Sequence, residues 1–593
     1  MKVISAQKAA EMLSLWSVVV NTLAVLSIVV VVGLGDQRLA VIAPLVPLVI
    51  ILVRQRRALT RPPRGIGGIG RYLTARYLLV ATAAVLLYTV GDLRTFEILV
   101  AVLAIAALTL EPMLRSLNGV AVPYAANFPG HEARQRASFR YGWIFPLNLL
   151  GLLALTLTAL APTVLLLVAA LISLASLVTS LLAIVDILGR IRERRRFQAQ
   201  LPETLEAMEP GFYVYWHAPP RSAFQVTMWL PYLERLGVPF VLVVRTAANF
   251  RQLADVTDHP VLLRRSLTDL DDLIVPSVRG VFYVNNAMRN NHMVRYAELT
   301  HIQLLHGESD KASSATPIIR MYDRDFVAGQ AAIDRFDTFG VPMRPEIFRI
   351  VGRPQVEHVE EARGQIGRLE DRSVLYAPTW LGYQAETNYS SLPIGPAIVR
   401  ALLERGCRVV FRPHPYSSRS PELRESCREI REMLAADAAA TGREHLYGDL
   451  AETEMSIVDC FNASDAMISD VSAVVGDFLH SGKPLAMVSP RTGAAEFTRE
   501  FPMARAAYVL VSQGTEPTNL DEVLENLTGA DPHEAERKRW ATYYLGDIPR
   551  ESYAERFVDV AREELGLQAP APRGASDAAP TPERTVHGRR RRP

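Results

Sequence analysis

The chain contains little cysteine, and its cysteines follow no metal-binding or disulfide pattern. Cys407, Cys427 and Cys460 are the three in the sequence, with neither CxxC spacing nor a nearby histidine pattern. This argues against a zinc site or a disulfide framework, and we interpret the three as reduced cytosolic thiols, mostly in a core. A DxD-like pair of carboxylates at a strand end is also missing, and we therefore expect no essential metal and no cofactor.

An excess of charge of one sign is absent as well. Lysine and arginine number 64 and aspartate and glutamate 62, which leaves a formal net charge of +2. A chain so balanced offers no overall electrostatic reason to bind nucleic acid, and we expect no nucleic-acid partner.

Long apolar runs are abundant, and they are confined to the first third of the chain. Each is near or somewhat below the roughly 20 residues that span a bilayer. A cleaved signal peptide would not be followed by five more such runs, so we predict a six-span membrane domain at residues 1–196. The runs are Leu13–Leu34, Leu39–Val53, Leu73–Val90, Phe96–Leu110, Trp143–Ala161 and Val164–Leu188.

Basic residues predict the orientation of these spans. With six spans, all four basic clusters fall on one side, which the positive-inside rule makes cytoplasmic. We therefore expect a multi-pass protein of the cell membrane, with both termini and the catalytic domains cytoplasmic and with membrane lipid as a partner of the arginines. The clusters are Lys2 and Lys8; Arg54, Arg56, Arg57, Arg61 and Arg64; Arg134, Arg136 and Arg140; and Arg190, Arg192, Arg194, Arg195 and Arg196.

Ionisable residues are scarce within the spans, which favours an anchor over an ion path. Glu97 and Asp186 lie close to span ends. Charged groups deep in a membrane usually mark transport or proton pathways, so their scarcity argues against a transporter.

From Gly211 the pattern changes to short apolar strands that alternate with amphipathic helices, which is typical of parallel α/β sheets. The predicted fold class is an α-helical transmembrane domain followed by a GT-B-like pair of doubly wound parallel-sheet α/β domains. The predicted strands are Phe212–Trp216, Phe240–Val244, Val281–Val284, Ile302–Leu305, Phe326–Ala328 and Ile347–Val351 in the first domain, and Val374–Ala377, Val409–Phe411, Ala466–Ile468 and Leu485–Val488 in the second.

Breaks in the pattern place the domain boundaries. We predict a linker at 197–210, an N-terminal α/β domain at 211–352, a helix and linker within 353–372 and a C-terminal α/β domain at 373–567. Residues 568–593 are rich in Pro, Ala and Arg and are predicted to be a disordered basic tail.

Polar side chains follow several of the predicted strands, at the edge where doubly wound sheets bind ligands. His306 follows one strand, Thr379 another, and Arg412 and His414 a third. A neutral histidine can accept a hydroxyl proton and a protonated one can bind phosphate. Each of these residues alone also fits a packing or capping role, and Lys311 and Arg412 also fit solvated charges.

The stretch from Phe461 to Met487 predicts an anion site. Its strand stops at Ser469 and Asp470, and a helix follows over Ser472–His480. A helix entered from a strand presents unpaired N–H groups and the positive end of its dipole, and the two serines add hydroxyl donors. Taken alone, the pattern also fits an ordinary βα turn.

Together these motifs resemble the CDP-glycerol glycerophosphotransferase family, the enzymes that build teichoic acid-type polyol phosphate polymers. The resemblance extends over about Gly211 to Ala561. The motifs are HG…K, GxP, YAPTW, RPHP and ISDxSxxxxDF…KP, carried here by His306, Gly307 and Lys311; Gly352 and Pro354; Tyr376 to Trp380; Arg412 to Pro415; Ile468, Ser469, Asp470, Ser472, Asp477 and Phe478; and Lys483 and Pro484.

The resemblance implies catalytic roles for His306 and His414. It also implies that the C-terminal domain holds the CDP-polyol donor, with CDP-glycerol as the substrate, and that the N-terminal domain holds the acceptor, a polyprenyl-linked glycan or a polyol phosphate. We expect His306 to take the proton of the acceptor hydroxyl and CMP to leave. The expected substrate-binding residues are Lys311, Thr379, Arg412, Ser469, Asp470 and Ser472.

The chain departs from the family pattern at three places, and these departures affect the identity of polyol and acceptor. Glu308-Ser309-Asp310 replaces Thr-Pro-Leu, Leu381 replaces a basic residue, and Val471 replaces an aromatic one. Two alternatives stay open: a GT-B glycosyltransferase that uses a nucleotide sugar, and a non-catalytic membrane scaffold. The nucleotide released would separate the two enzymes, and release of none would favour the scaffold.

Overall fold

The computed structural model describes residues 6–33, 37–60, 69–90, 95–121, 124–128, 141–311, 314–382, 388–514 and 516–568. They divide into two compact units, Met1–Met208 with Val241–Val275, and Glu209–Phe240 with Pro276–Pro593. The predicted tail after residue 568 lies outside the described residues, as do the basic clusters predicted within 61–68 and 129–140.

Apolar helices dominate the first unit. Three segments are long and apolar enough to cross a membrane, Leu15–Gly33, Thr95–Val120 and Thr163–Met208, and three apolar helices are shorter. Each of the six predicted runs is mostly helical over its described residues, which indicates membrane association. The helices are α1 (Ala6–Gly33), α2 (Gln37–Arg54), α3 (Arg56–Thr60), α4 (Leu73–Val90), α5 (Thr95–Val120), α6 (Ile144–Thr156) and α7 (Pro162–Met208).

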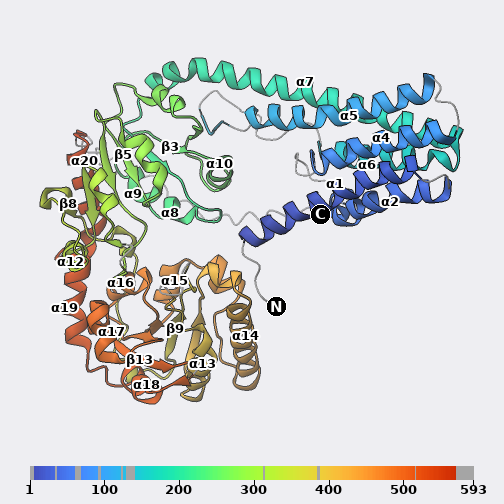
Figure 1. Ribbon diagram of the computed structural model, residues 1–593. Coiled ribbons are helices and arrows are strands. Elements are labelled where there is room, and N and C mark those ends of the chain that lie inside the picture. The colour runs from blue at the N-terminus through green and yellow to red at the C-terminus, as the bar shows by residue number, and fades with distance from the viewer. Residues whose placement is uncertain are drawn as a thin grey trace. The chain divides into compact units, whose positions relative to one another are not determined.

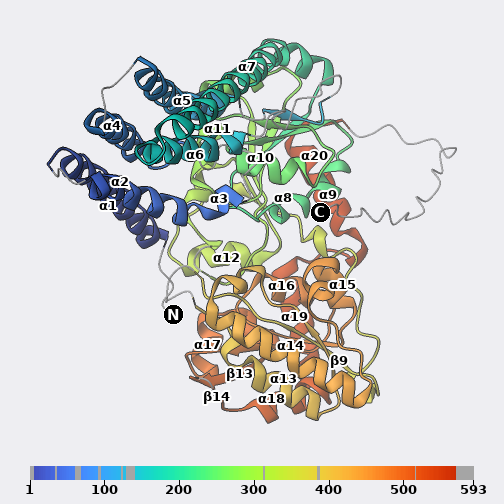
Figure 2. The same ribbon diagram turned by 90° about the vertical axis from the view of Figure 1, so that its right-hand side faces the viewer.

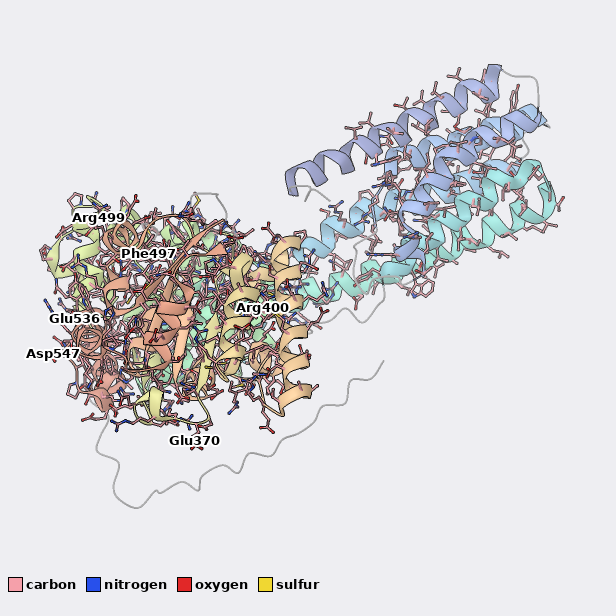
Figure 3. The ribbon with its side chains drawn as sticks, turned by 90° about the horizontal axis from the view of Figure 1, so that it is seen from below. Glu370, Arg400, Phe497, Arg499, Glu536 and Asp547 are labelled. Atoms are coloured by element: carbon pink, nitrogen blue, oxygen red, sulfur yellow. The ribbon has the colours of Figure 1, made fainter. Side chains whose placement is uncertain are left out.

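The surface of this bundle suits a lipid environment. Leu171, Val164 and Val185 each expose about two thirds of their surface. Figure 3 shows that side chains along these helices are mostly carbon, whereas those around Glu370 and Arg400 of the other unit carry many nitrogen and oxygen atoms. Helix α7 packs against both α5 and α6, as Figures 1 and 2 show.

A charged pair lies inside the bundle, which the sequence reading missed. Arg76 of α4 donates two hydrogen bonds, of 2.6 and 2.7 Å, to the Glu111 carboxylate of α5. Both side chains are fully buried. Asn148 of α6 donates to Glu111, and Ser176 of α7 donates to Asn148, so the network joins four helices. The apolar runs therefore contain a paired polar core as well as an anchor surface.

Helix α7 continues without a break to Met208, so the linker predicted at 197–210 is mostly helix. Its last turns pack on the segment after α5, where the Phe197 ring lies 5.2 Å from that of Tyr124. That segment forms β1 (Ala125–Ala126), which pairs antiparallel with β4 (Val261–Leu263). Strand β4 also pairs in parallel with β3 (Phe240–Val244), so a strand from between two apolar helices extends an α/β sheet within this unit.

The second unit contains two parallel sheet portions. The first runs in the order β2-β5-β6-β7-β8. These strands are almost wholly buried and rich in Val, Ile, Phe and Tyr, as strands covered on both faces are. They are β2 (Phe212–Trp216), β5 (Gly280–Tyr283), β6 (Thr300–Gln303), β7 (Arg324–Val327) and β8 (Phe348–Ile350), with α8 (Phe224–Thr227), α9 (Leu230–Glu234), α12 (Gln330–Thr338) and α20 (Tyr553–Glu564) beside them.

The second sheet has the order β10-β9-β11-β12-β13-β14 and is parallel except at β14. The chain passes from β9 outward to β10 and then returns to the other side of β9, so the sheet's direction of growth reverses between β9 and β11. Ligands of doubly wound sheets bind at this reversal. The strands are β9 (Ser373–Ala377), β10 (Arg408–Phe411), β11 (Ala466–Ser469), β12 (Leu485–Ser489), β13 (Tyr508–Gln513) and β14 (Glu516–Pro517).

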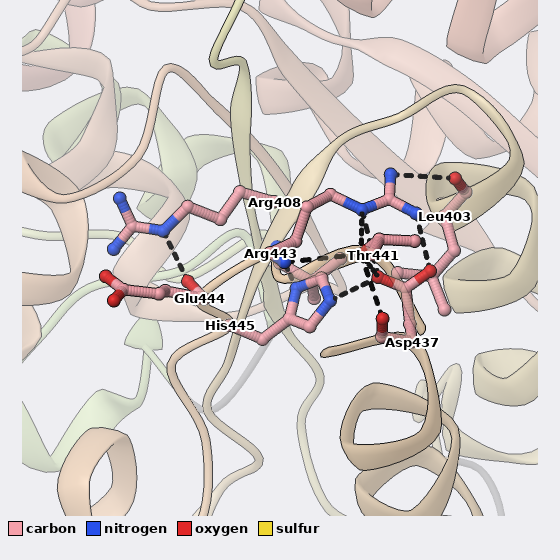
Figure 4. A network of polar contacts seen from close by, with 8 residues as sticks. Leu403, Arg408, Asp437, Thr441, Arg443, Glu444 and His445 are labelled. Atoms are coloured by element: carbon pink, nitrogen blue, oxygen red, sulfur yellow. Dashed lines mark hydrogen bonds and ion pairs between the residues drawn. The ribbon is translucent and has the colours of Figure 1, made fainter. Parts of the chain in front are cut away.

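Helices flank this second sheet on both faces. They are α13 (Gly395–Glu404), α14 (Pro421–Thr441), α15 (Ile457–Asn462), α16 (Ala473–Leu479), α17 (Ala494–Glu500), α18 (Leu520–Thr528) and α19 (Glu534–Leu545). A polar network closes the end of α14 against β10 (Figure 4): the His445 ring accepts from the Val409 N–H and lies 2.9 Å from the Asp437 carboxylate.

The predicted fold class is confirmed: apolar helices are followed by a GT-B-like pair of parallel-sheet α/β domains. All ten predicted strands exist, each within two residues of its predicted ends. Strands β1, β4, β13 and β14 were missed. The helix expected within 355–372 is wrong, because only the short 3-10 turns Pro354–Val356 and Ile366–Arg368 form there. The domain boundaries stay a prediction.

Candidate active site

His306 lies just beyond the carboxyl end of β6 and is half-buried. Its Nδ1 is 2.9 Å from the carbonyl oxygen of Val284. Because a carbonyl only accepts, Nδ1 carries the proton and Nε2 keeps the lone pair. Burial, with a contribution from the Arg353 charge, lowers the pKa of His306 below its usual 6.5. The neutral ring is therefore the main form near pH 7, with Nε2 able to accept a proton.

Gly307 brings this histidine loop against the start of α16. A Cβ built on Gly307 would lie 2.7 Å from the Cβ of Ala473, and its φ is +154°. Both the close approach and the backbone conformation favour glycine. The glycine of the HG motif thus lets the loop after β6 meet the turn after β11.

Arg353 links the same two segments, although the sequence analysis gave it no role. Its guanidinium donates to the Asp477 carboxylate of α16 at 2.8 Å and to the His306 carbonyl oxygen at 3.4 Å. Both side chains of the ion pair are largely buried. Arg353 is the middle residue of the GxP motif, whose match could have pointed to it, and Asp477 is a paired residue rather than a solvated one.

His414 follows β10 and has the opposite tautomer. Its Nδ1 accepts the Tyr416 backbone N–H at 3.1 Å, which leaves Nε2 to carry the proton of the neutral ring. Burial, with the charges of Lys311 and Arg419, lowers the pKa of His414 to about 4. The Trp380 ring of YAPTW stacks on it, with ring centroids 6.1 Å apart. His414 is therefore a neutral hydrogen-bond donor near pH 7.

Lys311 lies close enough to His414 and Asp470 to interact electrostatically with both. Its charge lowers the pKa of His414, and the Asp470 carboxylate interacts with its ammonium. Burial lowers the pKa of Lys311, and the Asp470 carboxylate opposes that shift. The ammonium lies over the Tyr389 ring, 5.4 Å from its centroid. The structure thus brings Lys311, His414 and Asp470 together from three separate motifs.

Asp470 lies at the reversal point between β9 and β11 and is fully buried. Its Oδ2 accepts the backbone N–H groups of Thr379, at 2.6 Å, and of Ser391, at 3.2 Å. Within the described part of the chain, its Oδ1 has no hydrogen-bond partner. Burial raises the pKa of Asp470 to about 7, against the hydrogen bonds from Ser391 and Thr379. Asp470 therefore ties two loops to the site and does not cap α16.

Two residues predicted to bind substrate are engaged elsewhere. The Ser469 hydroxyl is fully buried and donates to the Ala377 carbonyl at 2.7 Å. The Arg412 Nη1 donates to the carbonyl oxygens of Ala451 and Met455. The Ser469 hydroxyl and the Arg412 Nη1 thus hold the framework, because each donates to backbone carbonyls. Ser472, in contrast, is the N-cap residue of α16 and its side chain makes no capping bond.

The acidic departures from the family pattern have partners in this chain. Glu308 accepts the Ala328 N–H at 3.0 Å and pairs with Arg335 at 3.4 Å. Asp310 accepts the Met503 N–H at 2.8 Å and the Tyr544 hydroxyl at 2.8 Å. The Asp310 contacts hold the loop that carries Lys311 against the C-terminal part of the unit, and the Glu308 contacts hold it against β7 and α12. Because both carboxylates have hydrogen-bond or ion-pair partners, these departures argue against a degenerate domain.

Comparison with known families agrees with these motifs. Residues 338–541 match the family described as CDP-Glycerol:Poly(glycerophosphate) glycerophosphotransferase. The chain carries a domain of this family and is an enzyme of the glycerophosphotransferase type. The matched residues include Thr379, His414 and Asp470, whereas His306 and Lys311 precede them.

Solved structures show distant likenesses, and no curated protein matches the chain. The wall teichoic acid polymerase TagF is 14% identical, with 64% of this chain and 96% of that chain covered and a TM-score of 0.39. A UDP-N-acetylglucosamine 2-epimerase is 17% identical, with 61% and 97% covered and a TM-score of 0.38. A glycosyltransferase from Rickettsia africae is 10% identical, with 60% and 99% covered and a TM-score of 0.38.

Proposed function

We propose that the enzyme transfers glycerol phosphate, or a related polyol phosphate, from its CDP-activated form to a lipid-linked acceptor or a growing teichoic acid-like polymer. The family match over the C-terminal half supports the CDP-polyol donor. The observation that carries the reaction is the pair of histidines with opposite tautomers. His306 presents a lone pair for a proton, and His414 presents an N–H for a phosphate oxygen.

In the proposed step, an acceptor hydroxyl attacks the phosphorus that bears the polyol. The new oxygen–phosphorus bond forms as the bond from that phosphorus to the bridging oxygen breaks, and CMP leaves with the electron pair. The hydroxyl proton passes to Nε2 of His306. General-base help of this kind contributes typically about 10²- to 10⁴-fold to a rate.

His414 and Lys311 would stabilise the charge on the transferring phosphate. The N–H of His414 and the ammonium of Lys311 are donors held in place before substrate arrives, and phosphoryl transfer depends mainly on such positioning and charge neutralisation. Ser472 adds a hydroxyl at the start of α16. The Ser469 hydroxyl and the Nη1 of Arg412 would support the site without contacting the phosphate, because they hold backbone carbonyls.

We also propose that the apolar helices form a six-span domain with both termini and the catalytic domains on the cytoplasmic side. A CDP-polyol is charged and does not cross membranes, which suits a catalytic site on the cytoplasmic side. An acceptor held by a polyprenyl lipid would meet the enzyme at the membrane surface. The basic residues beside the spans would contact anionic lipid headgroups.

The test is nucleotide release by the detergent-purified full-length enzyme with a lipid-linked acceptor and CDP-glycerol, CDP-ribitol or nucleotide sugars. We expect CMP from one CDP-polyol, with His306→Ala and His414→Ala each reducing the rate by at least about 100-fold. His358→Ala is the matched control, since that side chain is 76% exposed, and it should keep normal turnover. Release of UDP or GDP from a sugar donor, or near-normal turnover in both variants, would contradict the proposal.

A further inference from the structure

The side chains around His306 form a chain of oriented amides that ends on its proton-accepting nitrogen. It begins at Asn285, just beyond β5. The Asn285 Oδ1 accepts the Ala287 N–H at 3.1 Å, and its Nδ2 donates to the His217 carbonyl at 3.1 Å. Because one side of this amide meets a donor and the other an acceptor, its orientation is determined by the backbone.

Gln225 of α8 takes its own orientation from that asparagine. Its Oε1 accepts from the Asn285 Nδ2 at 2.8 Å and from the Trp216 indole N–H at 3.1 Å. The reverse orientation of the amide would set its NH₂ group against two donors. The Gln225 NH₂ group therefore faces the other way, toward His306.

The last contact joins the Gln225 Nε2 to the His306 Nε2 at 3.3 Å. The amide can only donate there, and His306 Nδ1 already donates to the Val284 carbonyl. Both contacts favour the same tautomer of the ring. The Gln225 contact is long for a hydrogen bond, so an acceptor hydroxyl can replace it at little cost.

We propose that Gln225, oriented by Asn285 and Trp216, is a positioning residue that keeps the His306 Nε2 unprotonated and aimed at the acceptor hydroxyl. This inference rests on the proposed function for its catalytic meaning. When the acceptor binds, its hydroxyl displaces the Gln225 amide and takes over the lone pair. The proton then moves from that hydroxyl to Nε2 as the new oxygen–phosphorus bond forms and CMP departs.

The alternative is that Gln225 only packs beside the histidine. The Phe224 ring, 6.0 Å from the His306 ring, already supplies packing. The charged group that acts on His306 is Arg353, which is paired with Asp477 and stays in place in Gln225 variants. A structural role and a positioning role therefore differ in what a change of charge at Gln225 does to the ring.

Gln225→Glu is the discriminating variant and Gln225→Met is its matched control. The glutamate would turn an oxygen, which accepts, toward Nε2 and so stabilise a proton there. The methionine keeps the bulk and removes both polar groups. If Gln225 only packs, Gln225→Met should leave both the titration midpoint of His306 and kcat unchanged.

The measurement is carbethoxylation of His306 by diethyl pyrocarbonate across pH, followed by peptide mass spectrometry on the full-length protein, with His358 as an internal reference. In Gln225→Glu we expect the midpoint to rise by at least one pH unit, so that labelling in acid is about tenfold slower. In Gln225→Met the midpoint should move less. In both Gln225 variants, CMP release should show a lower kcat, with the KM for the donor nearly unchanged.

An unchanged His306 midpoint in folded Gln225→Glu would overturn the inference, as would equal shifts in the two variants. Asn285→Asp provides a second route if Gln225→Glu does not fold. A carboxylate there cannot donate to Gln225, so the glutamine amide should reverse and produce the same upward shift. If the wild-type enzyme turns over no CDP-polyol, the proposed function fails, and the labelling result still decides whether Gln225 controls the His306 proton.

Discussion

At the scale of single residues, the site depends on which nitrogen of each histidine holds the proton. His306 accepts through Nε2 and His414 donates through Nε2, and in each case a backbone group on Nδ1 sets the tautomer. Burial keeps both rings neutral near pH 7. The two side chains can therefore serve opposite roles without either being charged.

The lowered pKa of His306 predicts the acidic limb of the pH profile. A general base works in its neutral form, so the fall in kcat/KM that follows protonation of His306 should have its midpoint below pH 6.5. His414 should add a further loss only near its pKa of about 4. The check is CMP release from pH 4.5 to 8, with Asp470→Asn measured in parallel because Asp470 has a pKa of about 7. A base midpoint above 6.5 in both proteins would contradict the assignment.

Gly307→Ala should reduce turnover sharply while the protein stays folded. The new Cβ would lie 2.7 Å from that of Ala473, and the alanine would have to keep a positive φ. The loop that carries His306 must therefore shift. A misplacement of about 1 Å can cost about 100-fold in rate. Combining Gly307→Ala with Ala473→Gly removes the steric contact and leaves the backbone strain, so activity should recover in part. Full activity of Gly307→Ala alone would show that the close approach is unimportant.

At the scale of helices and strands, the apolar bundle is held by more than apolar packing. The Arg76–Glu111 pair and Asn148 connect α4, α5 and α6 in an interior that water does not reach. Polar groups in such surroundings must satisfy one another, because an unpaired one is costly.

Removal of one partner should therefore destabilise the bundle strongly. Glu111→Met or Arg76→Met leaves an uncompensated buried charge, which typically costs about 3–5 kcal/mol. The double variant Arg76→Met with Glu111→Met removes both charges and should be the more stable of the three. Thermal unfolding in detergent compares them, with Arg57→Met, from the exposed face of α3, as a control. A double variant as unstable as the sum of the singles would show that the two residues act independently.

At the scale of the whole molecule, the number of spans decides where the two ends lie. Six spans place both termini on one side, whereas the three longest segments alone would place them on opposite sides. We predict that tags at both ends are accessible to protease only from the cytoplasmic side. Protease protection in right-side-out and inverted vesicles makes the comparison, with a periplasmic or surface protein as the sidedness control. Tags found on opposite sides would indicate an odd number of spans and contradict the six-span prediction.

Local patterns in the sequence determined the elements and the family. A run of apolar residues, an alternating strand or a short motif such as YAPTW or RPHP is complete within a few neighbouring residues. It can therefore be recognised from the sequence alone. The six apolar helices, the ten predicted strands and the positions of His306 and His414 at strand ends all came from such patterns. They miss short strands such as β4, because three residues carry too little pattern.

The tertiary structure alone decided which polar atoms are available to a ligand. Ser469 and Arg412 occupy motif positions, yet the Ser469 hydroxyl and the Arg412 Nη1 donate to carbonyls 92 and 43 residues away in sequence. Arg353 is held in position by its ion pair with Asp477, which lies 124 residues further along the chain. A hydrogen bond depends on the distance and angle between two groups, and folding brings together groups whose positions no local pattern relates. The chemistry of this site is therefore a property of long-range contacts, built on elements that short stretches of sequence already specify.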